Sequence, residues 1–165
     1  MRRALVLTIS DGVAAGTRQD ESGAALAARL EALHFEVERA AVPDEMDAIA
    51  QQVSGATSRR VLIVTTGGTG LGPRDVTPQS LHGLLDYEIP GFGEQMRAYG
   101  RARTPLADLS RSFAGVLGPT LVVCVPGSTG GALDSLSAIE PILDHALETL
   151  SGHPQHATKP PEKRG

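Results

Sequence analysis

Three short, almost uninterrupted apolar runs constrain the fold of this chain more than any other feature. They are Ala4–Ile9, Arg60–Thr66 and Thr120–Val125, and valine, leucine and isoleucine dominate each of them. A strand with one face in water alternates apolar and polar residues, whereas a continuous apolar run such as Ala4–Ile9 is typical of a strand buried on both faces of a parallel sheet. Such a sheet needs helices on both of its sides. The run Thr120–Val125 follows Ser112–Leu117 across Gly118 and Pro119, which indicates two strands around a tight turn.

The segments between these runs carry the spacing and the end signals of helices. They predict helices that begin near Asp20, Pro43 and Pro78, a helix over Phe92–Arg103, and two C-terminal helices over Gly131–Ala138 and Glu140–Leu150. Further strands are predicted over Phe35–Val42 and Ser112–Leu117, and Ser10–Gly16 is expected to be a loop. Alternating strands and helices predict an α/β domain with a mostly parallel sheet.

Length and composition bound the function. The 165 residues fit one domain over residues 1–150, and residues 151–165, with three prolines and few apolar side chains, are expected to be a disordered tail. A net charge of −4 and an aromatic share of 3% argue against nucleic acid as a partner. No apolar stretch reaches the ~20 residues of a membrane span, and the N-terminus lacks the pattern of a signal peptide, so we expect a cytoplasmic protein without a membrane partner. The single cysteine, Cys124, excludes an intramolecular disulfide and a Cys-rich zinc site.

The loop after the run Arg60–Thr66 is the most informative part of the sequence. Four glycines within the six residues 67–72 let backbone N–H groups approach an anion closely. Arg74 adds a fork for phosphate oxygens, and Asp75 is a possible Mg²⁺ ligand. The spacing is that of neither a P-loop nor a dinucleotide fingerprint. The alternative is a glycine-rich turn in which Asp75 caps the next helix.

Asp44 follows the strand Phe35–Val42 and is the second candidate. The loops after the second and third strands of a parallel sheet open at the same edge, so Asp44 and Asp75 are expected to face one cleft. Two carboxylates beside a phosphate site repel the phosphate unless a metal or a proton transfer is involved, which favours Mg²⁺–nucleotide chemistry. The alternative is that Asp44 and Glu45 only stabilise a helix N-terminus.

Three further loops are weaker candidates. The segments Ser10–Gly12 and Asp20–Gly23 follow the first strand, and a helix start there could bind an anion or could simply be capped by Asp20 or Ser22. The loops Leu109–Ser112 and Pro126–Gly131 are small, polar and in part basic, and either could be a plain connection.

Taken in order, these loops resemble the Mog/MoaB family of molybdenum-cofactor biosynthesis proteins, whose domain also occurs as the G domain of gephyrin-like proteins. The resemblance runs from about Leu5 to Leu150. It rests on six motifs: Ser10–Asp11 with Gly16 and Asp20–Gly23, Val42–Glu45, Thr66–Gly70 with Arg74–Pro78, Ile89–Glu94, Leu109–Ser112 and Val125–Ser128. The chain departs from the family pattern at Thr129, where many members have proline, and over Leu71–Pro73.

The resemblance implies a three-layer α/β/α domain that assembles as a homotrimer. It implies a molybdopterin adenylyltransferase, which uses ATP, Mg²⁺ and molybdopterin, releases pyrophosphate, and could pass its product to a molybdenum insertase. The catalytic and metal-binding carboxylates would be Asp44 and Asp75. The nucleotide phosphates would contact Asp20, Ser22, Gly23, Gly67, Gly68, Thr69, Gly70 and Arg74. The molybdopterin would contact Ser110, Arg111, Ser112, Pro126, Gly127 and Ser128.

Two other functions stay open on the sequence. One is a non-catalytic molybdopterin-binding paralogue that serves as a binding or assembly module. The other is an unrelated flavodoxin-like nucleotide binder.

Overall fold

The structure is a computed structural model that describes residues 1–152. The tail predicted over residues 151–165 therefore lies outside the described residues from position 153 onward. No helix of the described part is both long and apolar enough to cross a membrane.

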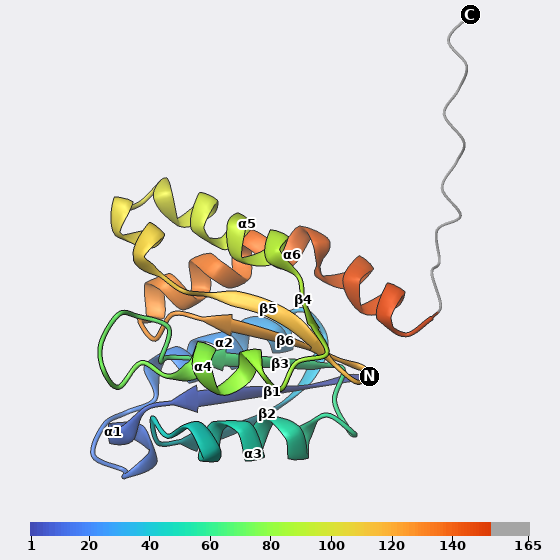
Figure 1. Cartoon of the computed structure of the whole chain (residues 1–165). Coiled ribbons are helices and arrows are strands. Elements are labelled where there is room, and N and C mark those ends of the chain that lie inside the picture. Colours follow the sequence, from blue (N-terminus) through green and yellow to red (C-terminus); the bar gives the residue numbers. More distant parts are fainter. Residues whose placement is uncertain (153–165) are drawn as a thin grey trace, which may run out of the picture.

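Six strands form one mixed sheet, and the helices lie on both of its sides (Figure 1). The strands are β1 (Arg2–Ile9), β2 (Phe35–Val42), β3 (Leu62–Thr66), β4 (Tyr87–Glu88), β5 (Phe113–Leu117) and β6 (Thr120–Val125). The helices are α1 (Asp11–Ala14), α2 (Glu21–Ala32), α3 (Met46–Ala56), α4 (Thr77–His82), α5 (Pro90–Arg101) and α6 (Thr129–Leu150), with a 3₁₀ turn η1 (Pro105–Leu109). The strand order is β2-β1-β3-β6-β5-β4, in which β2, β1, β3 and β6 are parallel and β5 is antiparallel to both of its neighbours. The predicted three-layer α/β/α fold is confirmed.

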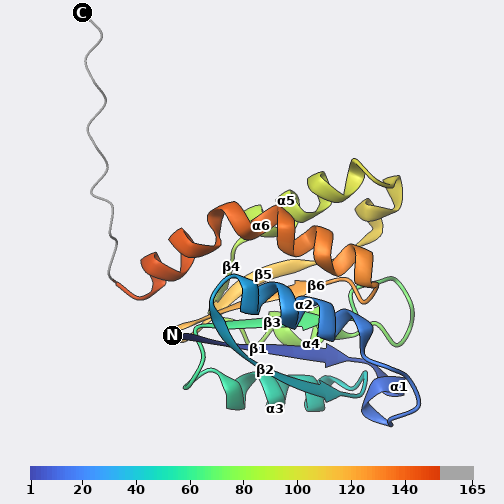
Figure 2. The same ribbon diagram turned by 180° about the vertical axis from the view of Figure 1, so that it is seen from behind.

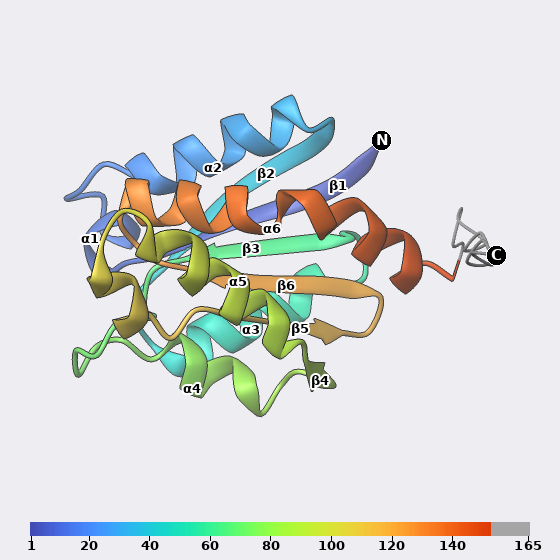
Figure 3. The same ribbon diagram turned by 90° about the horizontal axis from the view of Figure 1, so that it is seen from above.

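Alternate residues of the buried strands supply two separate cores. On one face, Ala4 and Val6 of β1 join side chains of α2, α5 and α6. On the other face, Leu5 and Leu7 join side chains of α3 and α4. Figures 2 and 3 show the first group of helices over one side of the sheet and α3 and α4 on the opposite side. The continuous apolar runs thus reflect burial on both faces.

The predicted break between two C-terminal helices at Pro141 was wrong, because α6 is one helix from Thr129 to Leu150 (Figure 3). Proline lacks the N–H that would bond to the carbonyl four residues earlier, which weakens a helix at that point. Ile139 and Leu143, on either side of the proline, are both buried in the same core. Packing on the sheet therefore holds the helix together across Pro141, whose own side is exposed.

The helix predicted from Pro78 up to the stop at Ile89–Gly91, with Leu81, Leu84 and Leu85 at helical spacing, is shorter than expected, since α4 ends at His82. The chain then enters the short edge strand β4, which pairs with β5 through Tyr87 opposite Val116. Leu85 still reaches the core that lies under α4. Its apolar spacing was a sign of burial and not of helix.

Two smaller corrections concern the loops near the sheet edge. The helix expected to begin at Pro43 begins at Met46, because Pro43 and Glu45 form a turn in which Glu45 N–H donates to the Pro43 carbonyl. The loop expected over Ser10–Gly16 contains the one-turn helix α1, whose N-cap is Ser10. Asp44 therefore lies in a turn, free of any helix.

The strand order fixes where a ligand can bind. In the sheet, β2 lies on one side of β1 and β3 lies on the other side. The direction in which the chain adds strands therefore reverses between β1 and β3. Ligands of open α/β sheets bind beyond the carboxyl ends of the strands at such a reversal. The loops that follow Ile9 and Thr66 flank this point.

Candidate active site

The glycine loop, residues 67–72, begins directly at the end of β3 and is anchored at its first turn. The Gly67 N–H donates to the Val125 carbonyl over 3.2 Å, and Thr77 Oγ1 donates to the Gly67 carbonyl over 2.9 Å. Gly67 and Gly68 have φ angles of 105° and 69°, a region that L side chains disfavour. A Cβ on Gly67 would lie 2.3 Å from the Ile9 carbonyl oxygen. Only glycine lets the backbone pass so close to β1.

Four consecutive N–H groups of this loop, from Gly68 to Leu71, donate no hydrogen bond within the described residues. The loop folds instead around its carbonyls, which accept from Thr77 and Arg111. A run of unused N–H groups in a glycine-rich turn is an anion-binding arrangement. This is the geometry that the sequence pattern of four glycines predicts for a phosphate site.

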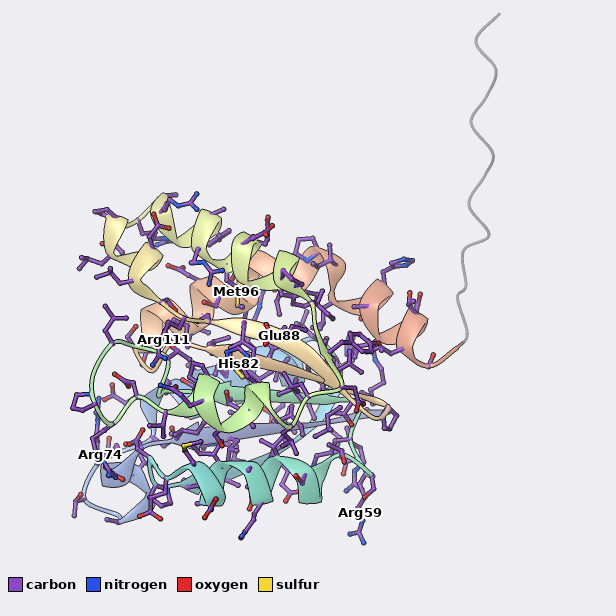
Figure 4. The ribbon with its side chains drawn as sticks, viewed as in Figure 1. Arg59, Arg74, His82, Glu88, Met96 and Arg111 are labelled. Atoms are coloured by element: carbon purple, nitrogen blue, oxygen red, sulfur yellow. The ribbon has the colours of Figure 1, made fainter. Side chains whose placement is uncertain are left out.

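Asp44 is held by a reciprocal pair of hydrogen bonds with Asp11. The Asp11 N–H donates to Asp44 Oδ2, and the Asp44 N–H donates to Asp11 Oδ1, both over 3.0 Å. Arg74 forks onto the Asp11 carboxylate through three contacts of 2.8 to 3.1 Å. Figure 4 shows Arg74 beside α1, at the far end of the loop that follows β3. The three residues tie the loops after β1, β2 and β3 together.

These contacts shift the pKa values of the two acids in opposite directions. The N–H of Asp44 and the Arg74 guanidinium hold the pKa of Asp11 below its usual range. Burial raises the pKa of Asp44, and the negative charges of Asp11 and Asp75 raise it further. The hydrogen bond from the Asp11 N–H and the positive charge of Arg74 oppose this rise. Burial of Asp44 is thus the main cause of its raised pKa, and the nearby carboxylates add to it.

Asp75 lies at the other end of the glycine loop. Its Oδ2 accepts from the Gly72 N–H over 2.8 Å, and no ion pair of the described residues includes it. The helix-capping alternative is not met, because α4 begins at Thr77 with Val76 as its N-cap and without a side-chain cap. The Asp75 carboxylate closes the loop on itself.

Asp44 and Asp75 line the same cavity, as the topology predicted. This hollow, the phosphate cavity, has a volume of about 580 Å³ and lies at the carboxyl ends of β1 and β3. It brings together the following predicted site residues: Asp20, Ser22, Asp44, Gly67, Gly68, Asp75, Gly127 and Ser128. Arg74 does not line it, because its guanidinium is engaged with Asp11.

The start of α2 forms one wall of the phosphate cavity. Asp20 is its N-cap and accepts from the Gly23 N–H over 3.0 Å, from Thr8 Oγ1 over 2.8 Å and from Arg39 over 2.8 Å. The capping role that the sequence left open for Asp20 is therefore confirmed. Gly23 itself is buried, and a Cβ there would lie 2.4 Å from Thr8 Oγ1. The positive end of the α2 dipole faces the cavity.

The segment Ser110–Ser112 lies on the other side of the glycine loop. The hydroxyls of Ser110 and Ser112 lie 2.7 Å apart. Both residues line a second hollow of about 450 Å³ between α5, η1 and the start of α6, which we call the apolar cavity. Arg97 stabilises its wall by donating to the Ser112 carbonyl over 2.8 Å. The guanidinium of Arg111 does not line the apolar cavity but donates to carbonyls of the glycine loop.

A third hollow of about 470 Å³ connects the two cavities. It shares Gly68, Asp75 and Gly127 with the phosphate cavity, and Leu106, Ser110 and Pro126 with the apolar cavity. The result is a continuous trough, polar and acidic at one end and mostly apolar at the other. Polar groups placed beside apolar walls are typical of small-molecule sites.

Sequence reasoning missed several residues of the phosphate cavity, of which Arg18 is the most informative. It is exposed and lines the cavity, and its guanidinium takes part in no hydrogen bond or ion pair of the described residues, although its backbone N–H donates to the Gly12 carbonyl over 3.2 Å. Thr8 and Thr66 also line the cavity although both belong to buried strands. A basic residue two positions before a helix cap was the only signal for Arg18 in the sequence.

The chain matches the family model described as a probable molybdopterin binding domain over residues 5–145. This match covers most of the chain and includes every loop of the trough. The chain belongs to this molybdopterin-binding family. The resemblance read from the six loop motifs is thereby confirmed.

Members of the molybdopterin-binding family with solved structures have the same fold. The structure of MoaB from Thermus thermophilus is 44% identical, with a TM-score of 0.86 over 94% of this chain and all of that one. A structure of MogA gives a TM-score of 0.87 at 37% identity, over 90% of this chain and 99% of that one.

Curated members of the family differ in length. The molybdenum cofactor biosynthesis bifunctional protein of Chlorobaculum tepidum is 41% identical over 91% of this chain and 49% of its own length, so the chain spans about half of that relative. A molybdopterin adenylyltransferase of Helicobacter pylori is 32% identical, over 90% of this chain and 87% of its own length.

Proposed function

We propose that this chain transfers the adenylyl group of ATP to the terminal phosphate of molybdopterin, giving adenylyl-molybdopterin and pyrophosphate. The observation that carries the proposal is the trough, which joins the glycine loop with its unused N–H groups and two carboxylates to an apolar cavity. The names of relatives of similar length, molybdopterin adenylyltransferase among them, support this reaction.

The nucleotide phosphates would lie against the glycine loop. The unused N–H groups from Gly68 to Leu71 would donate to phosphate oxygens, and the start of α2 with Ser22 would face them across the cavity. Asp20 would act by capping that helix, and Arg18 would supply a cation for the outer phosphates.

Asp44 and Asp75 fit a divalent cation. The described residues hold no group of three or more His, Cys, Asp or Glu side chains that could form a complete metal cage. Mg²⁺ usually takes only one or two carboxylates and completes its shell with water and substrate phosphates, and Asp44 and Asp75 line one cavity. When bound, Mg²⁺ would neutralise charge on the α-phosphate and on the departing pyrophosphate.

The remaining steps of the transfer depend on how molybdopterin and ATP are placed in the trough. The pterin ring would occupy the apolar cavity beside Ser110 and Ser112, and its terminal phosphate would enter through the connecting hollow past Gly127 and Ser128. A phosphate oxygen of molybdopterin then forms a bond to the α-phosphorus of ATP as the bond to pyrophosphate breaks. Because the attacking group is already an ionised phosphate, no strong general base is required. The chain's contribution is orientation and fixed dipoles around the reacting phosphates.

We also propose that the protein assembles as a homotrimer and passes its product to a molybdenum insertase, as the family resemblance implies.

The two carboxylates provide the test. We expect Asp44→Asn and Asp75→Asn each to lower Mg²⁺-dependent pyrophosphate release by ~10²-fold, because each removes charge from the reacting centre. Asparagine keeps an oxygen for the N–H of Asp11 or Gly72, so the loops should stay folded. The double variant should be barely slower than either single variant if both residues hold one ion.

The control is Asp47→Asn, an exposed acid on α3 that lines none of the three hollows and should release pyrophosphate at the wild-type rate. Wild-type protein that binds molybdopterin and ATP without releasing pyrophosphate would favour the non-catalytic paralogue. In that case Asp44→Asn should leave the affinity for ATP unchanged or improve it.

A further inference from the structure

Arg111 lies between η1 and β5, and its guanidinium contacts the glycine loop. Nε and Nη2 donate to the Gly70 carbonyl over 2.9 and 2.7 Å, and Nη2 also donates to the Asp75 carbonyl over 2.7 Å. The Arg111 backbone N–H donates to the Thr69 carbonyl over 2.9 Å. Figure 4 shows the side chain beside this loop. One residue therefore holds three carbonyls of a segment that carries four glycines.

The held carbonyls determine where the loop's N–H groups point. In a planar trans peptide the C=O and the following N–H are antiparallel. Because the Thr69 and Gly70 carbonyls turn toward Arg111, the N–H groups of Gly70 and Leu71 turn away from it. These belong to the run of N–H groups that have no partner within the described residues. Arg111 thus orients two donors of the proposed phosphate site.

The same guanidinium fixes the backbone of Asp75. With the Asp75 carbonyl held by Arg111 and its carboxylate held by the Gly72 N–H, the residue is fixed at both ends. Glycines 67, 68, 70 and 72 provide no side chain that could restrict the peptide planes, and glycine has more backbone freedom than any other residue. No carboxylate forms an ion pair with Arg111 among the described residues, so its charge is directed to carbonyl oxygens.

We propose that Arg111 is a positioning residue for the nucleotide phosphates, which acts by orienting the glycine loop and not by touching molybdopterin. This inference rests on the proposed function and replaces the direct substrate contact expected for Arg111 from the family resemblance. Lysine cannot replace it, because an ammonium is a point charge without the planar fork that reaches two carbonyls at once.

The test separates the two substrates. In Arg111→Lys, isothermal titration with Mg²⁺ and ATP should show a dissociation constant raised roughly tenfold or more, as expected for the loss of charge-assisted hydrogen bonds. Molybdopterin affinity, followed by the pterin fluorescence, should stay within about twofold of the wild-type value, because a substitution at an independent site leaves it nearly unchanged. In steady-state turnover, the KM for ATP should rise and the KM for molybdopterin should not.

The matched control is Arg60→Lys. Arg60 also donates to a backbone carbonyl, that of Ala56, but it lies near the amino end of β3, away from the trough. It should leave both affinities unchanged. If Arg111→Lys fails to fold, as judged by circular dichroism, Arg111→Gln keeps two N–H donors and serves as the second variant.

A loss of molybdopterin affinity with normal ATP binding would overturn the inference and restore Arg111 as a substrate contact. Unchanged affinity for both ligands would overturn it as well. Wild-type protein that binds ATP but releases no pyrophosphate would refute the proposed transfer, while the ATP titrations of the variants would still decide the role of Arg111.

Discussion

Replacement of Gly67 by alanine should be among the most costly single changes at the site. Two separate effects contribute. A non-glycine residue at φ 105° carries backbone strain of about 1–3 kcal/mol. The new Cβ would also lie 2.3 Å from the Ile9 carbonyl oxygen, a backbone atom that cannot move without displacing β1, and overpacking of this kind costs about 1–3 kcal/mol.

The two effects together give a loss of about 4 kcal/mol in the free energy of unfolding. For a domain of this size, each kcal/mol lowers Tm by roughly 2–4 °C, so Gly67→Ala should melt about 8–16 °C below the wild type. Urea unfolding followed by circular dichroism measures the free energy directly. Wild type and variants must be compared at one protein concentration, because assembly would make Tm depend on concentration.

Gly16→Ala separates the two effects. Gly16 has φ 75°, but a Cβ there would meet nothing within 4 Å. It should therefore lose only the backbone strain, about 1–2 kcal/mol. If Gly67→Ala and Gly16→Ala lost the same free energy within about 0.5 kcal/mol, the close approach of β3's loop to Ile9 would carry no energetic weight and our reasoning would be refuted.

Three further outcomes are expected. Arg18→Gln should raise the dissociation constant for Mg²⁺ and ATP about five- to tenfold without a change in Tm. Arg59→Gln, at the opposite end of the molecule (Figure 4), should leave this dissociation constant unchanged. Equal dissociation constants for the two variants would remove Arg18 from the site. The Cys124 thiol is buried, and burial raises its pKa to about 12, so it is protonated at pH 8. Ellman's reagent should therefore label it only when urea unfolds the chain. Rapid labelling of the native protein would contradict this burial. Light scattering at micromolar concentration should give a mass near three chains, and a monomer under those conditions would count against the proposed trimer.

The local sequence was sufficient to predict the layers and the sheet edge that carries the site. The runs that became β1, β3 and β6 are apolar on both faces, and that pattern has few solutions other than a parallel sheet covered on both sides. The position of Asp44 and Asp75 in one cavity also followed from the sequence, because parallel strands present their carboxyl ends at one edge.

Other features depended on contacts between residues far apart in the chain. Helical spacing over Leu81–Leu85 could not show that α4 ends at His82 and that the chain then pairs with β5 through Tyr87. Pro141 could not show that the core would hold α6 together. Arg74 and Arg111 looked alike as phosphate or substrate ligands. Only the folded chain brings Arg74 onto Asp11 and Arg111 onto the carbonyls of the glycine loop.

The division has a physical reason. Burial and backbone conformation depend on residue type and near neighbours, so the apolar runs and the glycine loop could be interpreted from the sequence. The direction of a long charged side chain depends on which partner lies within reach after folding, and 63 residues separate Arg74 from Asp11 while 41 separate Arg111 from Gly70. Sequence determined where the site would form, and the tertiary structure decided which of its charges face the cavity and which hold its walls.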